Sequence, residues 1–414
     1  MTKVEASRAL RRAFDKALAL SANDWRYAQF ALPTSNARYH HVVVNWLRVE
    51  VHRDQPKGVW RRTHGHGSPG YHGKPRRRSG AKTSEEHADA RWRRLPQRLR
   101  GDIASKQNLE YNLRHGVRHL TAAARQRPKG GWDPDELKQM KDNCDKYGVV
   151  FEAIRMDSDY IRLSKGPERD REIDTVASNI RKAAQIGVKI ITYHWELIPF
   201  RRNGKTPGRG GVVYDCFKLE DDWKSLPMGN TGRVTKEDYW ERITYFLEKI
   251  IPVAKENDVR MACHPSDPPG LPVGYQGVDQ WDSPEIFDAL KRYESIADTT
   301  YNGFQLDLGT SAAGLRNPGT EVLPIVEYLG RRMKIHQIHM RGIRGGLYNY
   351  CEVFPDEGEV NFVEVMRILR DTEFSGSICP DHMPKHPDDP GDFQAFAFGY
   401  GYIKGLMQLV NSEA

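Results

Sequence analysis

The sequence predicts an α/β fold in which parallel strands alternate with helices, in the form of a (β/α)₈ (TIM) barrel over residues 105–414. Short β-branched or aromatic runs alternate with amphipathic stretches throughout this part of the chain, as expected for a parallel sheet. No GxGxxG or GxxxxGK[ST] motif follows an early strand, and this absence weakens the doubly wound alternative. The seven predicted strands are 117–121, 149–154, 188–194, 259–264, 303–307, 334–339 and 376–381.

The stretches between these strands carry helix start signals. Pro134 and Pro284 each stand where a first helical residue is expected, because proline is tolerated there. Thr235 and Asp238 have the spacing of a capping box. Pro252 lies inside the helical pattern that follows, and we expect it to kink or split that helix.

The first quarter of the chain differs from the rest in charge and composition. Residues 1–104 contain 22 Lys and Arg against 9 Asp and Glu, whereas the remainder contains 41 against 46, so the net charge of +8 belongs to this basic N-terminal segment. An eighth barrel strand has its only good candidate at 42–47. Residues 55–102 are arginine-rich and poor in aliphatic side chains, which predicts an irregular, solvated segment; nucleic-acid binding by this segment is the alternative.

Several classes of protein are disfavoured by composition. No stretch approaches the roughly 20 apolar residues of a membrane helix, and the amino terminus has no apolar core typical of a secretory signal. The five cysteines are scattered, odd in number and without a CxxC pair, which fits a reduced cytoplasm and argues against a structural zinc knuckle. We therefore expect a cytoplasmic protein that does not act at a membrane.

Chemistry concentrates where the predicted strands end. Barrels of this type carry their active sites at the carboxyl ends of the strands, and five consecutive late strands end in His or Asp. Two imidazoles and two carboxylates suit a divalent cation, most simply Mn²⁺, with Fe²⁺, Co²⁺, Zn²⁺ or Mg²⁺ as alternatives. Taken singly, a strand-end His is more often a hydrogen-bonded structural residue, and an Asp there is often a helix N-cap. The predicted ligands are His264, Asp307, His339 and Asp381.

Six motifs carry a resemblance to a known family: MACHPSDPPGLP, NGFQLDLGT, IHQIHMRG, YCEVFPDEGEVNF, CPDHMP and GYIKGL. Together they resemble mannonate dehydratase, a family of the xylose-isomerase-like TIM-barrel superfamily, over about residues 105–414. The resemblance implies that His264, His339 and Asp381 are metal ligands. It also implies that His382 is a catalytic proton-transfer residue.

Three positions depart from the family's pattern. The family's fourth ligand is a cysteine, whereas this chain has Asp307 there, and a carboxylate makes the site harder. An arginine-asparagine pair after the metal histidine is replaced by Arg341-Gly342. The family's catalytic tyrosine aligns with Phe393 or Gln394, and the tyrosines of the last helix are not convincing substitutes.

The resemblance implies a metal-dependent lyase that dehydrates a sugar acid to a 2-keto-3-deoxy product. We expect His382 to move a proton, His194 to contact substrate hydroxyls, and Arg341 either to bind the substrate carboxylate or to orient a ligand carboxylate through a salt bridge. A sugar isomerase, an epimerase or a keto-sugar glycoside lyase on the same barrel is the alternative. A nucleic-acid-binding protein or metal endonuclease is a remote one, because the barrel is acidic. The expected partner is thus a small carbohydrate; a homo-oligomer stays open.

Overall fold

The computed structural model describes residues 40–44, 47–51, 104–124, 131–156, 160–198, 202–389 and 391–413. All of them belong to one unit, His40–Ala414. The segment 55–102, for which the sequence predicts irregular structure, lies outside the described residues.

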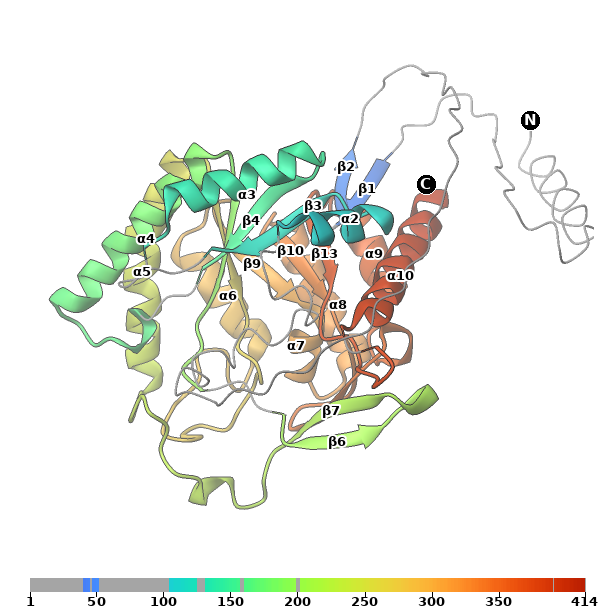
Figure 1. The fold of residues 1–414 in the computed structure, drawn as a ribbon. Coiled ribbons are helices and arrows are strands. Elements are labelled where there is room, and N and C mark those ends of the chain that lie inside the picture. Colours follow the sequence, from blue (N-terminus) through green and yellow to red (C-terminus); the bar gives the residue numbers. More distant parts are fainter. Residues whose placement is uncertain are drawn as a thin grey trace, which may run out of the picture. The chain divides into compact units, whose positions relative to one another are not determined.

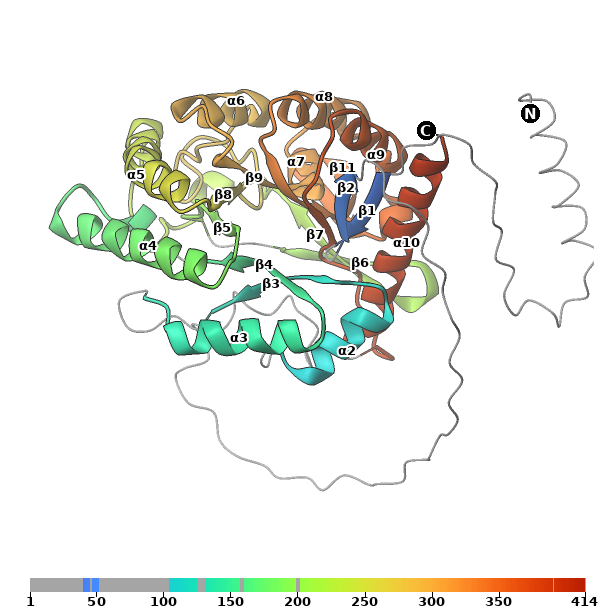
Figure 2. The ribbon, with the colours of Figure 1, turned by 90° about the horizontal axis from the view of Figure 1, so that it is seen from above.

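Seven parallel strands form a nearly closed barrel, and all seven were predicted from the sequence (Figure 2). Each strand pairs in parallel with the next one of this set along the chain. The predicted TIM-barrel fold is thereby confirmed. The strands are β3 (His119–Ala123), β4 (Val150–Arg155), β5 (Ile190–His194), β8 (Arg260–His264), β9 (Asn302–Asp307), β10 (Ile335–Met340) and β13 (Ser377–Pro380).

A hairpin occupies the edge of the sheet beside β13. The predicted eighth strand, 42–47, spans the end of β1 (His40–Val44) and the beginning of β2 (Leu47–Val51). These two strands pair antiparallel with each other, and β2 pairs antiparallel with β13. The strand at this edge therefore runs against the barrel strands, and the described residues contain no eighth parallel strand.

Helices surround the barrel strands (Figures 1 and 2). In α9 the buried residues Phe362, Val365, Met366 and Leu369 recur every three or four positions, so one apolar face packs onto the barrel. No helix in the described part of the chain is long and apolar enough to cross a membrane. The α-helices are α2 (Lys106–Arg114), α3 (Pro134–Lys146), α4 (Pro167–Gln185), α5 (Lys236–Glu256), α6 (Ile286–Ile296), α7 (Leu308–Ala313), α8 (Pro318–Arg331), α9 (Phe362–Asp371) and α10 (Phe393–Ser412).

Two of the predicted helix starts are confirmed, and the one at Pro284 is wrong. Pro134 begins α3, and Thr235 with Asp238 forms the predicted capping box of α5. Pro284 does not begin a helix, because α6 begins two residues later. The helix α5 runs through Pro252 without being split, so of the two predicted effects of this proline the split is absent.

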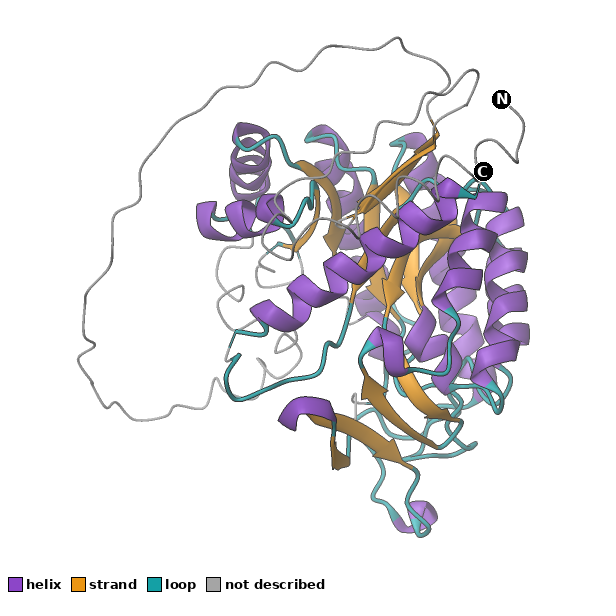
Figure 3. Ribbon diagram, turned by 90° about the vertical axis from the view of Figure 1, so that its right-hand side faces the viewer, coloured by secondary structure: helices purple, strands orange, loops and turns teal. Residues whose placement is uncertain are grey.

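A four-stranded antiparallel sheet, the side sheet, adjoins the carboxyl end of β10 (Figures 1 and 3). Its strands, in spatial order, are β11 (Gly342–Gly346), β12 (Asn349–Val353), β7 (Val213–Lys218) and β6 (Gly204–Pro207). Cys216 of β7 and Cys351 of β12 lie opposite each other and form a disulfide. The scattered cysteines were interpreted as fitting a reduced cytoplasm, and this disulfide, whose members are 135 positions apart, runs against that interpretation.

Candidate active site

Strand register brings the predicted strand-end residues to one level of the barrel. His194 of β5 lies opposite His264 of β8, and Asp307 of β9 lies opposite His339 of β10. Met340 pairs with Pro380, the last residue of β13, and Asp381 follows directly after it. The carboxyl ends of neighbouring parallel strands thus gather these side chains, as the sequence predicts.

The four residues predicted as metal ligands form a continuous cluster. Oδ2 of Asp307 lies 3.4 Å from Nε2 of His264 and 3.9 Å from Nδ1 of His339. The same Nδ1 lies 3.4 Å from Oδ2 of Asp381. One ligand atom each from His264, Asp307 and His339 lies within 4.8 Å of the other two. Donor atoms around one ion, each about 2.0–2.2 Å from it, have separations of this order.

Local structure directs one atom each of Asp307 and His264 into this cluster. Asp307 is the N-cap of α7, and its Oδ1 accepts a hydrogen bond from the Thr310 backbone N–H at 2.7 Å. Its buried Oδ2 accepts no well-aligned hydrogen bond in the described part of the chain. Nδ1 of His264 lies 2.6 Å from the carbonyl oxygen of Pro265, to which it donates, so Nε2 is the ring nitrogen that faces Asp307. A buried carboxylate oxygen and an imidazole nitrogen facing each other fit a shared cation.

The electrostatics of the cluster also fit a cation. Burial opposes ionisation of Asp307, but Arg341 and His264 outweigh it and hold the pKa of the carboxyl well below its usual range. Burial likewise opposes ionisation of Asp381, yet His382 and His339 keep its pKa well below the ordinary value. Both carboxylates are therefore ionised. The side chains of His339, His264 and Asp381 keep 12 %, 15 % and 19 % of their surface exposed, so a small solute can reach them.

The predicted site residue Arg341 lies beside the cluster, together with one arginine and two carboxylates that the sequence did not single out: Arg202, Asp267 and Glu352. Arg341 is fully buried, and its Nη1 donates to Oδ2 of Asp267 at 3.0 Å and to Oε1 of Glu352 at 2.9 Å. Arg202 donates to the same two carboxylates, at 2.8 Å and 2.6 Å. Nδ1 of His382 lies 2.5 Å from Oε1 of Glu352. Asp267 lies in the HPSDPP motif and Glu352 in the YCEVFP motif, and these motifs could have pointed to both residues from the sequence.

This second cluster is not suited to a cation, although Asp267, Glu352 and His382 also place ligand atoms within 4.8 Å of one another. Two guanidinium groups already neutralise the two carboxylates. Burial lowers the pKa of Arg202, but Asp267 and Glu352 more than compensate and raise it above its ordinary value. The cluster is a compact ion-pair network whose own charges balance.

The remaining predicted residues lie around these clusters. Nδ1 of His194 lies 3.4 Å from Nη2 of Arg155, and its Nε2 lies 4.0 Å from a carboxylate oxygen of Glu196. The ring of Phe393, where the family's tyrosine aligns, packs against Tyr111 with centroids 4.8 Å apart. Tyr400 is buried in a small apolar cluster that includes Tyr111.

The barrel and its polar strand ends define the protein as a TIM-barrel enzyme. Comparison with known protein families specifies it further. The model of the family described as D-mannonate dehydratase (UxuA) matches residues 99–202 and 226–413, well over half of the chain. The chain belongs to this family and is therefore a carbohydrate dehydratase, as its motifs predict.

Individual relatives agree with this assignment. The mannonate dehydratase of Streptococcus suis is 24% identical over 338 residues, which cover 71% of this chain and 87% of the relative. That of Thermotoga petrophila is 28% identical over 340 residues, which cover 72% of this chain and 91% of the relative. The crystal structure of a Streptococcus suis mannonate dehydratase superposes with a TM-score of 0.61 at 22% identity, over 72% of this chain and 89% of the other. At this identity the structural likeness supports the fold.

Proposed function

We propose that the protein is a divalent-cation-dependent lyase that dehydrates D-mannonate, or a closely related sugar acid, to a 2-keto-3-deoxy product. Family membership supports the reaction and the sugar-acid substrate. The observation that carries the metal dependence is the buried Oδ2 of Asp307, which has no well-aligned hydrogen bond in the described part of the chain and faces Nε2 of His264 and Nδ1 of His339.

In this proposal His264, Asp307, His339 and Asp381 hold the cation. Two nitrogen and two oxygen donors suit Mn²⁺, and Fe²⁺, Co²⁺ and Zn²⁺ are compatible with the same set, whereas Mg²⁺ fits less well because of the histidines. A bound cation supplies polarisation of substrate oxygens, which favours both loss of the carbon-bound proton and departure of the hydroxyl group.

His382 is the proposed proton-transfer residue. Its Nε2 lies 3.3 Å from Oδ2 of Asp381, so the imidazole stands directly beside the proposed cation site. Nδ1 is turned toward Glu352 instead. An imidazole that borders the substrate space can take the proton from carbon or deliver one to the departing hydroxyl group.

Arg341 and His194 have supporting roles in the proposal. Of the two roles open for Arg341, the contacts favour orientation of carboxylates, because its guanidinium donates to Asp267 and Glu352 and lies 3.4 Å from Oδ2 of Asp307. His194 stands at the same level of the barrel as His264 and is proposed to contact substrate hydroxyls.

The alternatives differ in the product that they form. An isomerase or epimerase on the same barrel gives a product of unchanged composition, and a keto-sugar glycoside lyase releases an alcohol, whereas a dehydratase releases water. Membership in a dehydratase family favours the last of these. A nucleic-acid partner has no support from the barrel, whose charge is acidic. The cytoplasmic location stays a prediction, which the Cys216–Cys351 disulfide does not favour, and a homo-oligomeric state stays open.

The test is an assay of the metal-stripped and metal-restored full chain on D-mannonate and a panel of aldonic and uronic acids. We expect a 2-keto-3-deoxy acid from D-mannonate or a near relative, formed only when Mn²⁺ or another divalent cation is restored. Formation of an isomeric sugar would favour the isomerase alternative. Equal turnover in the stripped protein would reject metal dependence.

A further inference from the structure

The two ring nitrogens of His382 face two different carboxylates. Nδ1 lies 2.5 Å from Oε1 of Glu352, and Nε2 lies 3.3 Å from Oδ2 of Asp381. Asp381 belongs to the proposed cation site, whereas Glu352 belongs to the side sheet. His382 itself has a φ of 49°, in the left-handed region that few non-glycine residues adopt, so the surrounding contacts help to hold it there.

The charge on Glu352 requires a hydrogen on Nδ1 of His382. Burial raises the pKa of this carboxyl, but Arg202, His382 and Arg341 together hold it well below its ordinary range, so the group is ionised. An ionised carboxylate can only accept hydrogen bonds, and Nδ1 must therefore be the donor. Nη1 of Arg341 also lies 2.7 Å from this Nδ1. Because both atoms are then donors, that approach is not a hydrogen bond; both donate to the same Oε1.

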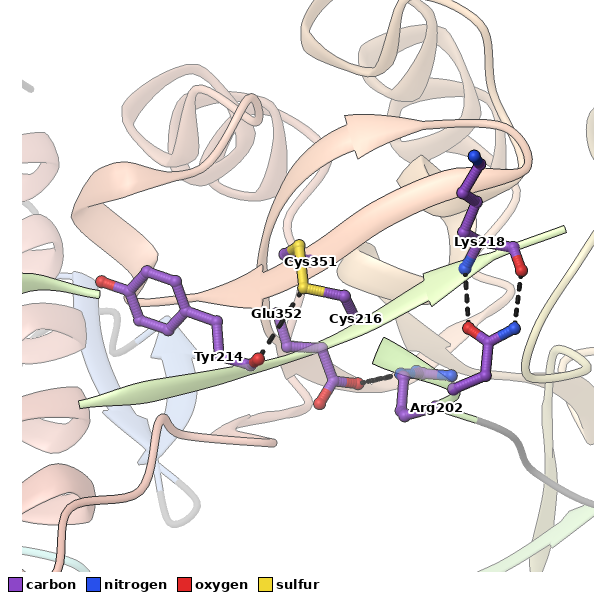
Figure 4. Close-up of a disulfide and its surroundings, with 7 residues drawn as sticks. Arg202, Tyr214, Cys216, Lys218, Cys351 and Glu352 are labelled. Atoms are coloured by element: carbon purple, nitrogen blue, oxygen red, sulfur yellow. Dashed lines mark hydrogen bonds and ion pairs between the residues drawn. A yellow bond between two sulfur atoms is a disulfide. The ribbon is translucent and has the colours of Figure 1, made fainter. Parts of the chain in front are cut away.

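The position of Glu352 is fixed by its strand. It stands on β12, between Cys351, which is bonded to Cys216 of β7, and the end of the strand. Figure 4 shows the disulfide beside Glu352, and the contact of its carboxylate with Arg202. Arg202 donates to Oε1 of Glu352 through both Nε, at 2.9 Å, and Nη2, at 2.6 Å. The β12 backbone and the hydrogen bonds from Arg202 thus both fix the position of Oε1 of Glu352, the oxygen that contacts His382.

We propose that Glu352 is a positioning residue: it accepts a hydrogen bond from Nδ1–H of His382 and so holds the imidazole with Nε2 directed to the cation site. This inference rests on the proposed function, in which His382 transfers the proton. Without the acceptor, Nη1 of Arg341 is placed to donate to Nδ1, and Nδ1 would then carry no hydrogen.

The kinetic test compares Glu352→Met with Glu352→Gln. Both remove the charge and keep the volume, but only methionine removes the strong acceptor. We expect Glu352→Met to lower kcat by about 10- to 100-fold, with KM and metal content retained, and Glu352→Gln to lower it much less. In a His382→Asn background, Glu352→Met should lower kcat little further, because Glu352 acts through His382. Losses that multiply in the double variant, or equal losses for methionine and glutamine, would overturn the proposal.

A spectroscopic test separates this inference from the proposed function. Long-range ¹H–¹⁵N correlations of the full chain loaded with diamagnetic Zn²⁺ show whether Nδ1 carries a hydrogen, and the His382 signal is identified by its absence in His382→Asn. We expect Nδ1–H in the unaltered protein and in Glu352→Gln, and Nδ1 without a hydrogen in Glu352→Met. Nδ1 without a hydrogen in the unaltered protein, or no change in Glu352→Met, would overturn the role of Glu352 even if dehydration is observed. Should no sugar acid react, the proposed function fails, and this measurement still decides whether Nδ1–H faces Glu352.

Discussion

Asp307 stands where the motifs of the family lead one to expect a cysteine, and the structure shows what the carboxylate adds. Its Oδ1 caps the amino terminus of α7, while Oδ2 faces the histidines of the proposed cation site. A thiolate has one donor atom and could not serve both purposes. The exchange of cysteine for aspartate therefore couples the cation site to the start of α7, and it makes the site harder.

Two substitutions at Asp307 separate these purposes. Asp307→Ser keeps a good N-cap residue and removes the ligand, so we expect loss of bound metal with little loss of stability. Asp307→Cys supplies a soft ligand and a poor cap. It should shift the preference from Mn²⁺ toward Zn²⁺ and lower the free energy of unfolding by about 1 kcal/mol. Metal analysis after equilibration with both ions, together with urea unfolding, measures both effects; an unchanged metal preference in Asp307→Cys would argue against ligation by residue 307.

His382→Asn tests the division of labour within Pro380-Asp381-His382. We expect the variant to keep its fold and bound metal and to lose turnover by about 100-fold or more, because asparagine cannot transfer a proton. Asp381→Asn, in contrast, should lose metal as well as activity, since it removes a charged ligand. Metal occupancy and single-turnover rate are measured in the same preparation. Parallel loss of metal and rate in His382→Asn would reduce His382 to a support of Asp381.

At the scale of elements, the sequence predicted the strands and helices that depend on short stretches of the chain. Strand–helix alternation located all seven parallel strands, and the strand ends gave His264, Asp307 and His339 as neighbours. The side sheet was missed, because its short strands are joined through long-range antiparallel pairing that leaves no periodic signal. Glu352 stands on this unpredicted side sheet, so its contact with His382 could not be predicted either.

The disulfide between β7 and β12 should stabilise the folded chain. It closes a loop of 135 residues, and removing such a crosslink typically costs about 2–4 kcal/mol. We expect the double variant Cys216→Ala/Cys351→Ala to unfold at lower urea concentration than the oxidised protein. The reduced unaltered protein should approach the double variant, which itself should not respond to reductant. Equal stability of the oxidised protein and the double variant would contradict this assignment.

The loop that follows β8 contains a buried acid with a pH-dependent cost. Burial raises the pKa of Asp282 to about 6, although its carboxylate accepts a hydrogen bond from the Ser266 backbone N–H at 2.8 Å. A carboxyl whose pKa is higher in the folded state binds its proton more tightly there, so stability is lost as the pH rises from about 4 to about 6. Asp282→Asn removes this dependence. The free energy of unfolding of this variant, relative to that of the unaltered protein, should rise by up to about 3 kcal/mol as the pH increases from about 4 to about 6.

Urea midpoints of the two proteins at several pH values in this window give the difference directly, with the effects of all other groups cancelling. A difference that stays constant from about pH 4 to about pH 6 would show that Asp282 has an ordinary pKa in the folded protein.

At the scale of the whole molecule, the seven-stranded barrel has an open edge at β13, where β2 pairs. A chain that begins at residue 40 keeps this hairpin, whereas a chain that begins at residue 104 lacks it and exposes the edge of β13. We expect the shorter chain to melt at lower temperature and to aggregate more readily. Thermal unfolding and light scattering of the two chains compare them. Identical behaviour would mean that the hairpin contributes nothing to the barrel.

The central claim is that the strand-end residues hold one divalent cation. Crystals of the full chain soaked in Mn²⁺ and measured at the manganese absorption edge test it most directly. We predict one anomalous peak about 2.0–2.2 Å from the donor atoms of His264, Asp307, His339 and Asp381. The neighbouring cluster of Asp267, Glu352 and His382 should show no peak, because Arg202 and Arg341 already balance its charge. A peak in that second cluster, or none at the strand ends, would contradict the account.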